Sequence, residues 1–213
     1  MYRFVKTLAL GLGQLLRLFF PFKLSLLGRA FLAYVYTGYV KRDFASWGKG
    51  SVMVYKPIYM LGMKYVYVGT GTVIEKDVCL TAYDSYFGGM VFSPKIRIGN
   101  NCHIGVNVHI TAIDEIEIGD NLLTGSNVLI TDNAHGLFEL DMMGIPPVER
   151  PLVSKGKVKI GTNVWIGNNV CVLPGVTIGD GVVIGANSVV THDVPSFSMV
   201  GGIPAHVIKR IEV

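Results

Sequence analysis

Aliphatic residues return about every six positions along two long stretches of the chain. In most of these units another apolar residue stands two positions earlier, so that apolar side chains alternate with polar ones. Such alternation predicts very short strands that turn one face toward a core. The leading positions are Ile98, Ile104, Ile110, Ile118, Thr124 and Ile130, and then Ile160, Ile166, Val172, Ile178, Ile184 and Val190.

Asn or Gly stands three positions after most of the leading residues. These two residue types adopt positive φ angles more readily than others, so one of them in each unit predicts a corner at a fixed place. The corner positions are Asn101, Asn107, Asn121, Asn127, Asn163, Asn169, Gly175, Gly181 and Asn187.

A longer period lies above the six-residue one. The residue after each leading position reads Gly, Gly and then another type, and this order repeats every three units. One coil is therefore predicted to hold three strands and three corners. Stacked coils make an all-β solenoid shaped as a triangular prism with an aliphatic core, and Val68, Ile74 and Leu80 fit an earlier, less regular coil.

The repeat stops beside His135 and resumes only at Ile160. His135 follows Ile130 by five residues, which predicts an outward-facing position. Residues 136–158 are expected to leave the coil as a loop. A smooth prism has no pocket, so a loop beside an outward histidine would supply one wall of a site. Histidine titrates near neutral pH, which suits it to accept a proton from a nucleophile.

Residues 1–50 carry a net charge of +7, because eight Lys and Arg residues stand against Asp43 alone. The whole chain carries +4, which leaves −3 for residues 51–213. The basic character belongs to the N-terminal segment, so the charge of the protein is not evidence for a nucleic-acid-binding body, and no nucleic-acid partner is expected.

Residues 2–20 are predicted to form a basic amphipathic helix that ends at Pro21. A wide face of Phe and Leu residues stands opposite Arg3, Lys6 and Arg17. The longest uncharged run is too short to span a bilayer. Two interpretations stay open: the helix packs on the coil or on a neighbouring subunit, or it lies in the plane of a membrane surface.

We expect three regions: a helical segment at 1–50, the coil at 51–207 with its loop at 136–158, and a tail at 208–213. Cys79, Cys102 and Cys171 are odd in number and form no metal-binding spacing, which indicates free thiols in a reducing compartment. The expected location is the cytoplasm, with peripheral contact on the inner face of the cytoplasmic membrane if residues 2–20 bind lipid.

The segment "KIGTNVWIGNNVCVLPGVTIGDGVVIGANSVVTHDVP", followed by "GGIPAHVIKRI", resembles the hexapeptide-repeat acyltransferases. The resemblance covers roughly residues 96–211 and implies a left-handed parallel β-helix. The segments "ITDNAHG" and "VERPLVSKGKVKIGTNVWIG" are most similar to sugar O-acetyltransferases of bacterial capsule and lipopolysaccharide clusters. The implied activity is transfer of an acetyl group from acetyl-CoA to a saccharide hydroxyl, by a homotrimer with no metal.

The resemblance also implies roles for particular residues. His135 matches the general base of the family, and Trp165 matches a residue beside the active-site groove. The residues implied to contact CoA are Trp165, Gly185, Ala186, Thr191, His192, His206, Lys209 and Arg210. His192 and His206 depart from the basic residues usual in the family. The family's sugar-binding positions have no clear match, which leaves Asn107, Asp114 and Asp132 as candidates.

The sequence leaves two other functions open. One alternative is a zinc-dependent hydratase similar to the γ-class carbonic anhydrases, with His103, His109 and His135 as zinc ligands. The γ-class enzymes, however, place their three ligands at a different spacing. A surface or subunit-interface position is the alternative for His103 and His109. A non-catalytic scaffold is the other possibility, but it would need neither His135 nor the CoA-like C-terminal segment. The sequence identifies neither the acceptor nor the acyl group.

Overall fold

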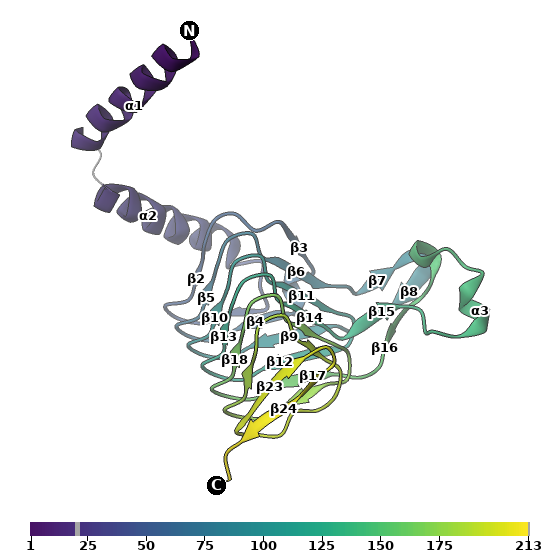
Figure 1. Ribbon diagram of the computed structural model, residues 1–213. Helices are drawn as coiled ribbons and strands as arrows, with labels where there is room; N and C mark the ends of the chain where they lie inside the picture. The colour runs from purple at the N-terminus through teal and green to yellow at the C-terminus, as the bar shows by residue number, and fades with distance from the viewer. Residues whose placement is uncertain (20–21, 213) are drawn as a thin grey trace.

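Three sheets of very short strands form the faces of a prism in the computed structural model, which describes residues 1–19 and 22–212 (Figure 1). The first sheet contains β1 (Ser46–Trp47), β4 (Val66–Val68), β9 (Lys95–Ile98), β12 (Glu115–Ile118), β17 (Val158–Ile160) and β20 (Thr177–Ile178). The second contains β2 (Val52–Met53), β5 (Val73–Ile74), β10 (His103–Ile104), β13 (Leu123–Thr124), β18 (Trp165–Ile166), β21 (Val183–Ile184), β23 (Ser198–Gly202) and β24 (Ala205–Arg210). The third contains β3 (Tyr59–Leu61), β6 (Cys79–Ala82), β11 (His109–Ala112), β14 (Leu129–Thr131), β19 (Cys171–Val172) and β22 (Val189–Val190).

Each coil contributes one strand to every sheet, and strands of successive coils pair in parallel. Ile98, for example, lies opposite Val68 and Ile118, one coil before and one coil after it. The β23–β24 pair at the C-terminal end is antiparallel. The predicted three-stranded coil is therefore confirmed, and so is the earlier coil at Val68, Ile74 and Leu80.

The leading positions fill the axis of the prism. All twelve are at most 3% exposed, including Thr124, the one polar member. Burial of each Ile contributes roughly 1.5–3 kcal/mol of hydrophobic stabilisation. The corners also follow the prediction, because every Asn and Gly expected there has a positive φ.

The glycines of the longer period allow the coils to stack closely. A Cβ atom placed on Gly119 would lie 2.8 Å from the carbonyl carbon and oxygen of Gly161 in the next coil. Side chains at the corners add a ladder of hydrogen bonds between coils. The Nδ2 atom of Asn107 donates to Oδ1 of Asn127 at 2.8 Å, and Asn127 donates in the same way to Asn169 at 3.0 Å.

Two helices precede the prism. Helix α1 (Tyr2–Phe19) agrees with the amphipathic helix predicted at 2–20, and its expected end at Pro21 lies outside the described residues. Helix α2 (Phe22–Val40) packs on β2 through Ala33, Thr37 and Val40, which are all buried. Thr37 Oγ1 accepts a hydrogen bond from the backbone N–H of Met53 at 2.9 Å, so α2 is attached to the first coil.

The boundaries of the coil differ from the expected 51–207. The first strand begins at Ser46 and pairs with β4, although residues 46–61 lack the regular six-residue pattern. Strand β24 continues to Arg210 into the expected tail, because its backbone pairs with β23. Hydrogen bonding of the backbone, rather than the hydrophobic pattern, sets both ends.

Candidate functional site

Two arms leave the third sheet on the same side of the prism (Figure 1). The first follows β6 and contains the antiparallel strands β7 (Ser85–Tyr86) and β8 (Met90–Val91), with a 3₁₀ turn at Phe87–Gly89. The second follows β14 and contains β15 (Asn133–His135), α3 (Leu140–Met143), a 3₁₀ turn at Pro147–Glu149 and β16 (Leu152–Ser154). A further 3₁₀ turn, Met63–Tyr65, precedes β4. Strands β6 and β14 flank β11, so the arms start two coils apart.

The segment expected as a loop at 136–158 does leave the coil, and the strand pairing of β15 with β16 closes its base. His135 lies opposite Leu152 in the β15–β16 ladder, and the N–H of Gly136 donates to the carbonyl of Pro151 at 2.7 Å. This pairing fixes the backbone beside His135, whose side chain is exposed. The predicted outward position of His135 is confirmed.

Tyr86 of the first arm contacts His135 of the second. Their ring centroids are 5.7 Å apart, with an angle of 66° between the ring planes. Tyr83 makes a similar edge contact with Tyr86, at 6.0 Å between centroids. The two arms therefore meet through an aromatic row that ends at the imidazole of His135.

A cavity of about 170 Å³ lies where the arms join the prism. It has aromatic, imidazole, hydroxyl and amide groups on its walls, a mixture that suits a polar ligand. Burial raises the pKa of the Tyr83 phenol, so this group keeps its proton at neutral pH. The lining residues are Tyr83, Tyr86, His109, Thr111, Asn133, His135 and Leu152.

His109 lines the same cavity as His135. It lies on β11, between Cys79 of β6 and Leu129 of β14. Its side chain is partly buried, and this burial lowers its pKa. His109 is therefore more than a plain surface residue, because it lines the cavity between the arms, whereas its place at a subunit interface stays a prediction. His103 lies on the second sheet, with Nε2 3.4 Å from Oε1 of Glu75.

Asp132 holds the corner from which the second arm leaves. It is completely buried, and its two carboxylate oxygens accept the backbone N–H groups of Ile113 and Asp114, each at 2.9 Å. Burial raises the pKa of this carboxyl group. Asn133 donates to Oδ1 of Asp132 at 3.1 Å and to the carbonyl of Thr111 at 3.2 Å. Asp132 was a candidate for substrate contact, but its burial gives it a structural role instead.

The other two substrate-binding candidates lie outside the set of residues that line the cavity. Asn107 belongs to the corner ladder of asparagines, where its amide group is bonded to Asn127. Asp114 is partly exposed, at the corner that follows β11.

The residues matched to CoA contact lie around the second sheet and the C-terminal end. Trp165 is 53% exposed on β18 and lies beside Val183 of β21. His206 and Lys209 lie on β24, opposite Gly201 and Met199 of β23. Gly185 and Ala186 follow β21, Thr191 follows β22 with its Oγ1 atom 2.7 Å from Nδ1 of His192, and Arg210 ends β24. None of these residues belongs to the set that lines the cavity at His135.

Sequence reasoning missed Tyr83 and Tyr86. The available signal was the first interruption of the repeat, between Leu80 and Ile96. The two interruptions leave the same sheet, and only the coiled structure places them on one side of the prism.

The described residues offer no group of three or more His, Cys, Asp or Glu side chains placed to hold a metal ion. His109 and His135 share a cavity, whereas His103 lies on another sheet.

Family comparisons match both stretches of the repeat. The pattern described as bacterial transferase hexapeptide (six repeats) matches residues 157–192, and that of the hexapeptide repeat of succinyl-transferase matches residues 95–132. A putative lipopolysaccharide biosynthesis O-acetyl transferase, WbbJ of Escherichia coli K12, is 41% identical over 131 residues. That match covers 60% of the present chain and 64% of WbbJ, which is less than two thirds of the relative.

Solved structures of acyltransferases have similar architecture. A maltose O-acetyltransferase from Clostridium difficile is 30% identical, with a TM-score of 0.51 over 82% of this chain and 73% of that one. A hexapeptide-repeat acetyltransferase from Vibrio cholerae, in complex with acetyl-CoA, is 25% identical, with a TM-score of 0.57 over 85% and 80%. AntD, an N-acyltransferase from Bacillus cereus in complex with dTDP and 3-hydroxybutyryl-CoA, is 22% identical, with a TM-score of 0.66 over 83% and 88%; at this identity the likeness concerns the fold alone.

Proposed function

Since the chain belongs to the family of hexapeptide-repeat transferases, we propose that it transfers an acetyl group from acetyl-CoA to a hydroxyl group of a saccharide. The acceptor is a surface polysaccharide or a precursor of one. The identity to a putative lipopolysaccharide O-acetyl transferase supports this substrate class. The coil is assigned the left hand typical of hexapeptide repeats, and the coil with its two arms is the proposed catalytic domain.

One observation carries the proposal. The exposed imidazole of His135 stands at a cavity formed by two arms, held by strand pairing behind it and by Tyr86 beside it. A histidine in such a fixed position is able to act on a polar ligand that enters between the arms. The neighbouring His109 has a lowered pKa and stays neutral at the working pH, so it adds no positive charge to the site.

In the proposed reaction, His135 removes the proton of the acceptor hydroxyl as its oxygen attacks the thioester carbonyl carbon. A tetrahedral intermediate forms, with negative charge on the former carbonyl oxygen. Its collapse breaks the carbon–sulfur bond and releases the CoA thiolate, which takes the proton from His135. The products are the acetyl ester and CoA, and the imidazole returns to its neutral form.

The proposed donor site uses other parts of the chain. The phosphates of acetyl-CoA bind near Lys209 and Arg210, helped by His192 and His206, and the pantetheine chain follows Gly185, Ala186 and Thr191 past Trp165. Most of these residues lie on or beside the second sheet, and Thr191 and His192 follow β22 at the C-terminal end of the third, whereas His135 stands on an arm that leaves the third sheet after β14. We therefore place each complete site between two subunits of a homotrimer, where the second sheet of one subunit faces the arms of the next.

The proposed location is the cytoplasm, where acetyl-CoA is made available to sugar-modifying enzymes. The three free cysteines are compatible with that reducing compartment. Asp114 remains the candidate for acceptor contact, because it is partly exposed near the corner that supports the second arm.

The direct test is release of free CoA thiol from acetyl-CoA in the presence of a panel of saccharides, with the product identified by mass spectrometry. We expect thiol release that depends on one class of saccharide and a mass increase of one acetyl group. Metal analysis of the same sample separates this function from that of a zinc-dependent hydratase. Stoichiometric zinc with no saccharide-dependent thiol release would refute the proposal, and so would an unreactive protein with neither property.

A further inference from the structure

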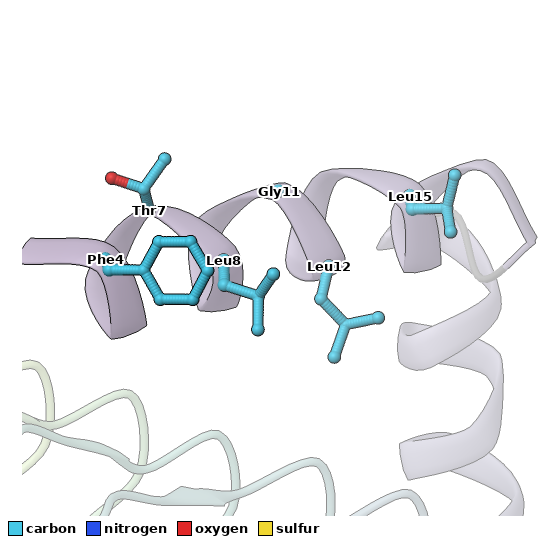
Figure 2. Close-up of a pocket in the computed structure, with 6 residues that line it drawn as sticks. All are labelled: Phe4, Thr7, Leu8, Gly11, Leu12 and Leu15. Atoms are coloured by element: carbon cyan, nitrogen blue, oxygen red, sulfur yellow. The ribbon is translucent and has the colours of Figure 1, made fainter. Parts of the chain in front are cut away.

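Helix α1 presents an apolar stripe that no other part of the described chain covers. Phe4, Leu8, Leu12 and Leu15 follow one another at spacings of four, four and three, and Figure 2 shows them along one helix with Gly11 between. Their exposed fractions are 72%, 65%, 57% and 54%. Within Tyr2–Phe19, all of which the structure describes, no side chain is buried. An uncovered stripe of this kind indicates a binding surface.

Charge on α1 is of one sign. Arg3, Lys6 and Arg17 stand on the arc opposite the apolar stripe, and the sequence has no Asp or Glu before Asp43. A second copy of α1 would therefore bring like charges together, without a carboxylate in either helix to pair with them. An anionic partner with an apolar interior satisfies both faces of the helix.

Helix α2 extends the exposed apolar surface toward the prism. Its inner face is attached to the first coil through Ala33, Thr37 and Val40. On the opposite side, four large side chains recur at spacings of three, four and four, and all of them are exposed. They are Leu24, Leu27, Phe31 and Val35.

We propose that α1 and the outer face of α2 bind the surface of an anionic lipid bilayer, with the helices in the plane of the interface. The apolar stripes enter the boundary between headgroups and acyl chains, and Arg3, Lys6 and Arg17 attract anionic headgroups. No helix among the described residues is long and apolar enough to cross a membrane. Because α2 is fixed to the first coil, the N-terminal end of the prism faces the lipid.

The charge of the remaining chain supports this orientation. Residues 51–213 carry a net charge of −3, so an anionic surface repels the prism while it attracts the helices. The helices therefore provide the contact, and the prism with its arms extends away from the bilayer. An acceptor saccharide that carries a lipid anchor would be held at the same surface.

Vesicle flotation with the full-length protein tests the proposal. We expect flotation with vesicles of phosphatidylcholine and phosphatidylglycerol, and less with phosphatidylcholine alone. Replacing Leu8 and Leu12 together by Glu should leave the protein in the soluble fraction. At low salt each basic residue removed should weaken binding by about fivefold, and added salt should reduce this effect.

A matched pair of double variants isolates the role of charge. Lys6→Gln with Arg17→Gln should weaken flotation, whereas Lys155→Gln with Lys159→Gln, which removes the same charge from exposed positions remote from the first coil, should not. Circular dichroism should report equal folding in all variants, since α1 buries no side chain in the described structure. Full-length protein that stays soluble with both vesicle compositions would overturn the proposal. The proposal would also be overturned if the protein with both Leu8→Glu and Leu12→Glu floated as well as the unchanged protein. A lower mass of this variant in light scattering would overturn it too, because it would show that the stripe binds a second subunit.

Discussion

The imidazole ring of His135 and the phenol ring of Tyr86 form a T-shaped contact, with 5.7 Å between the ring centroids. The two residues come from separate interruptions of the repeat, and each interruption forms its own arm. Their contact joins the arms above the cavity that also contains His109. The position of the proposed base thus depends on both arms.

Replacing His135 with Ala should lower kcat by on the order of 10²–10⁴-fold, because the acceptor hydroxyl loses its base. Steady-state kinetics by thiol release measures the loss, and circular dichroism checks the fold. His103→Ala is the matched control, because His103 lies on another sheet beside Glu75 and should retain activity. Unchanged activity in a folded His135→Ala variant would contradict the assignment.

Replacing Tyr86 with Ala should lower activity less than loss of His135. Aromatic pairs contribute about 0.5–1.5 kcal/mol, which corresponds to roughly 2- to 10-fold if the contact positions the imidazole. The loss should appear in kcat rather than in KM for acetyl-CoA, because the proposed donor site lies elsewhere. Tyr86→Phe retains the ring and should restore activity. Equal losses in the Ala and Phe variants would mean that the hydroxyl, rather than the ring contact, matters.

Burial of His109 should make the fold sensitive to acid. Its pKa is lowered from 6.5, so the unfolded chain binds a proton that the folded chain excludes. This contribution to stability is complete above the unfolded value of 6.5 and is lost as pH falls from there through the lowered folded pKa. Thermal unfolding from pH 7.5 to 5 should therefore show a smaller drop in Tm for His109→Gln than for the unchanged protein. Parallel curves for the two proteins would exclude His109 as the source.

The assembly should be a trimer at assay concentration. In one chain, most of the proposed CoA-binding residues lie on another face than the proposed base, and none lines its cavity, so a neighbouring subunit would bring them together. Light scattering coupled to gel filtration should give about three times the 23.2 kDa chain mass. An active monomer in that measurement would contradict this arrangement and would require a complete site within one chain.

The sequence alone determined the repeating part of the protein. Leading residues such as Ile98 and Ile166 are apolar at a fixed period, and corner residues such as Asn107 adopt positive φ. Both are local properties that every unit repeats, so they specify strand, corner and core without knowledge of the whole fold. His135 was found in the same way, because a break in a regular pattern is visible along the chain.

The tertiary structure decided what lies beside His135. Tyr86 and His109 approach it only because coils stack in register and two interruptions leave one side of the prism. Only the structure distinguishes the two helices: α2 packs on the first coil, whereas no side chain of α1 is buried among the described residues. From the sequence, Asp132 is a candidate for substrate contact, yet the fold buries its carboxylate against two backbone N–H groups. Such contacts join residues far apart along the chain, and a local pattern does not contain the packing that creates them.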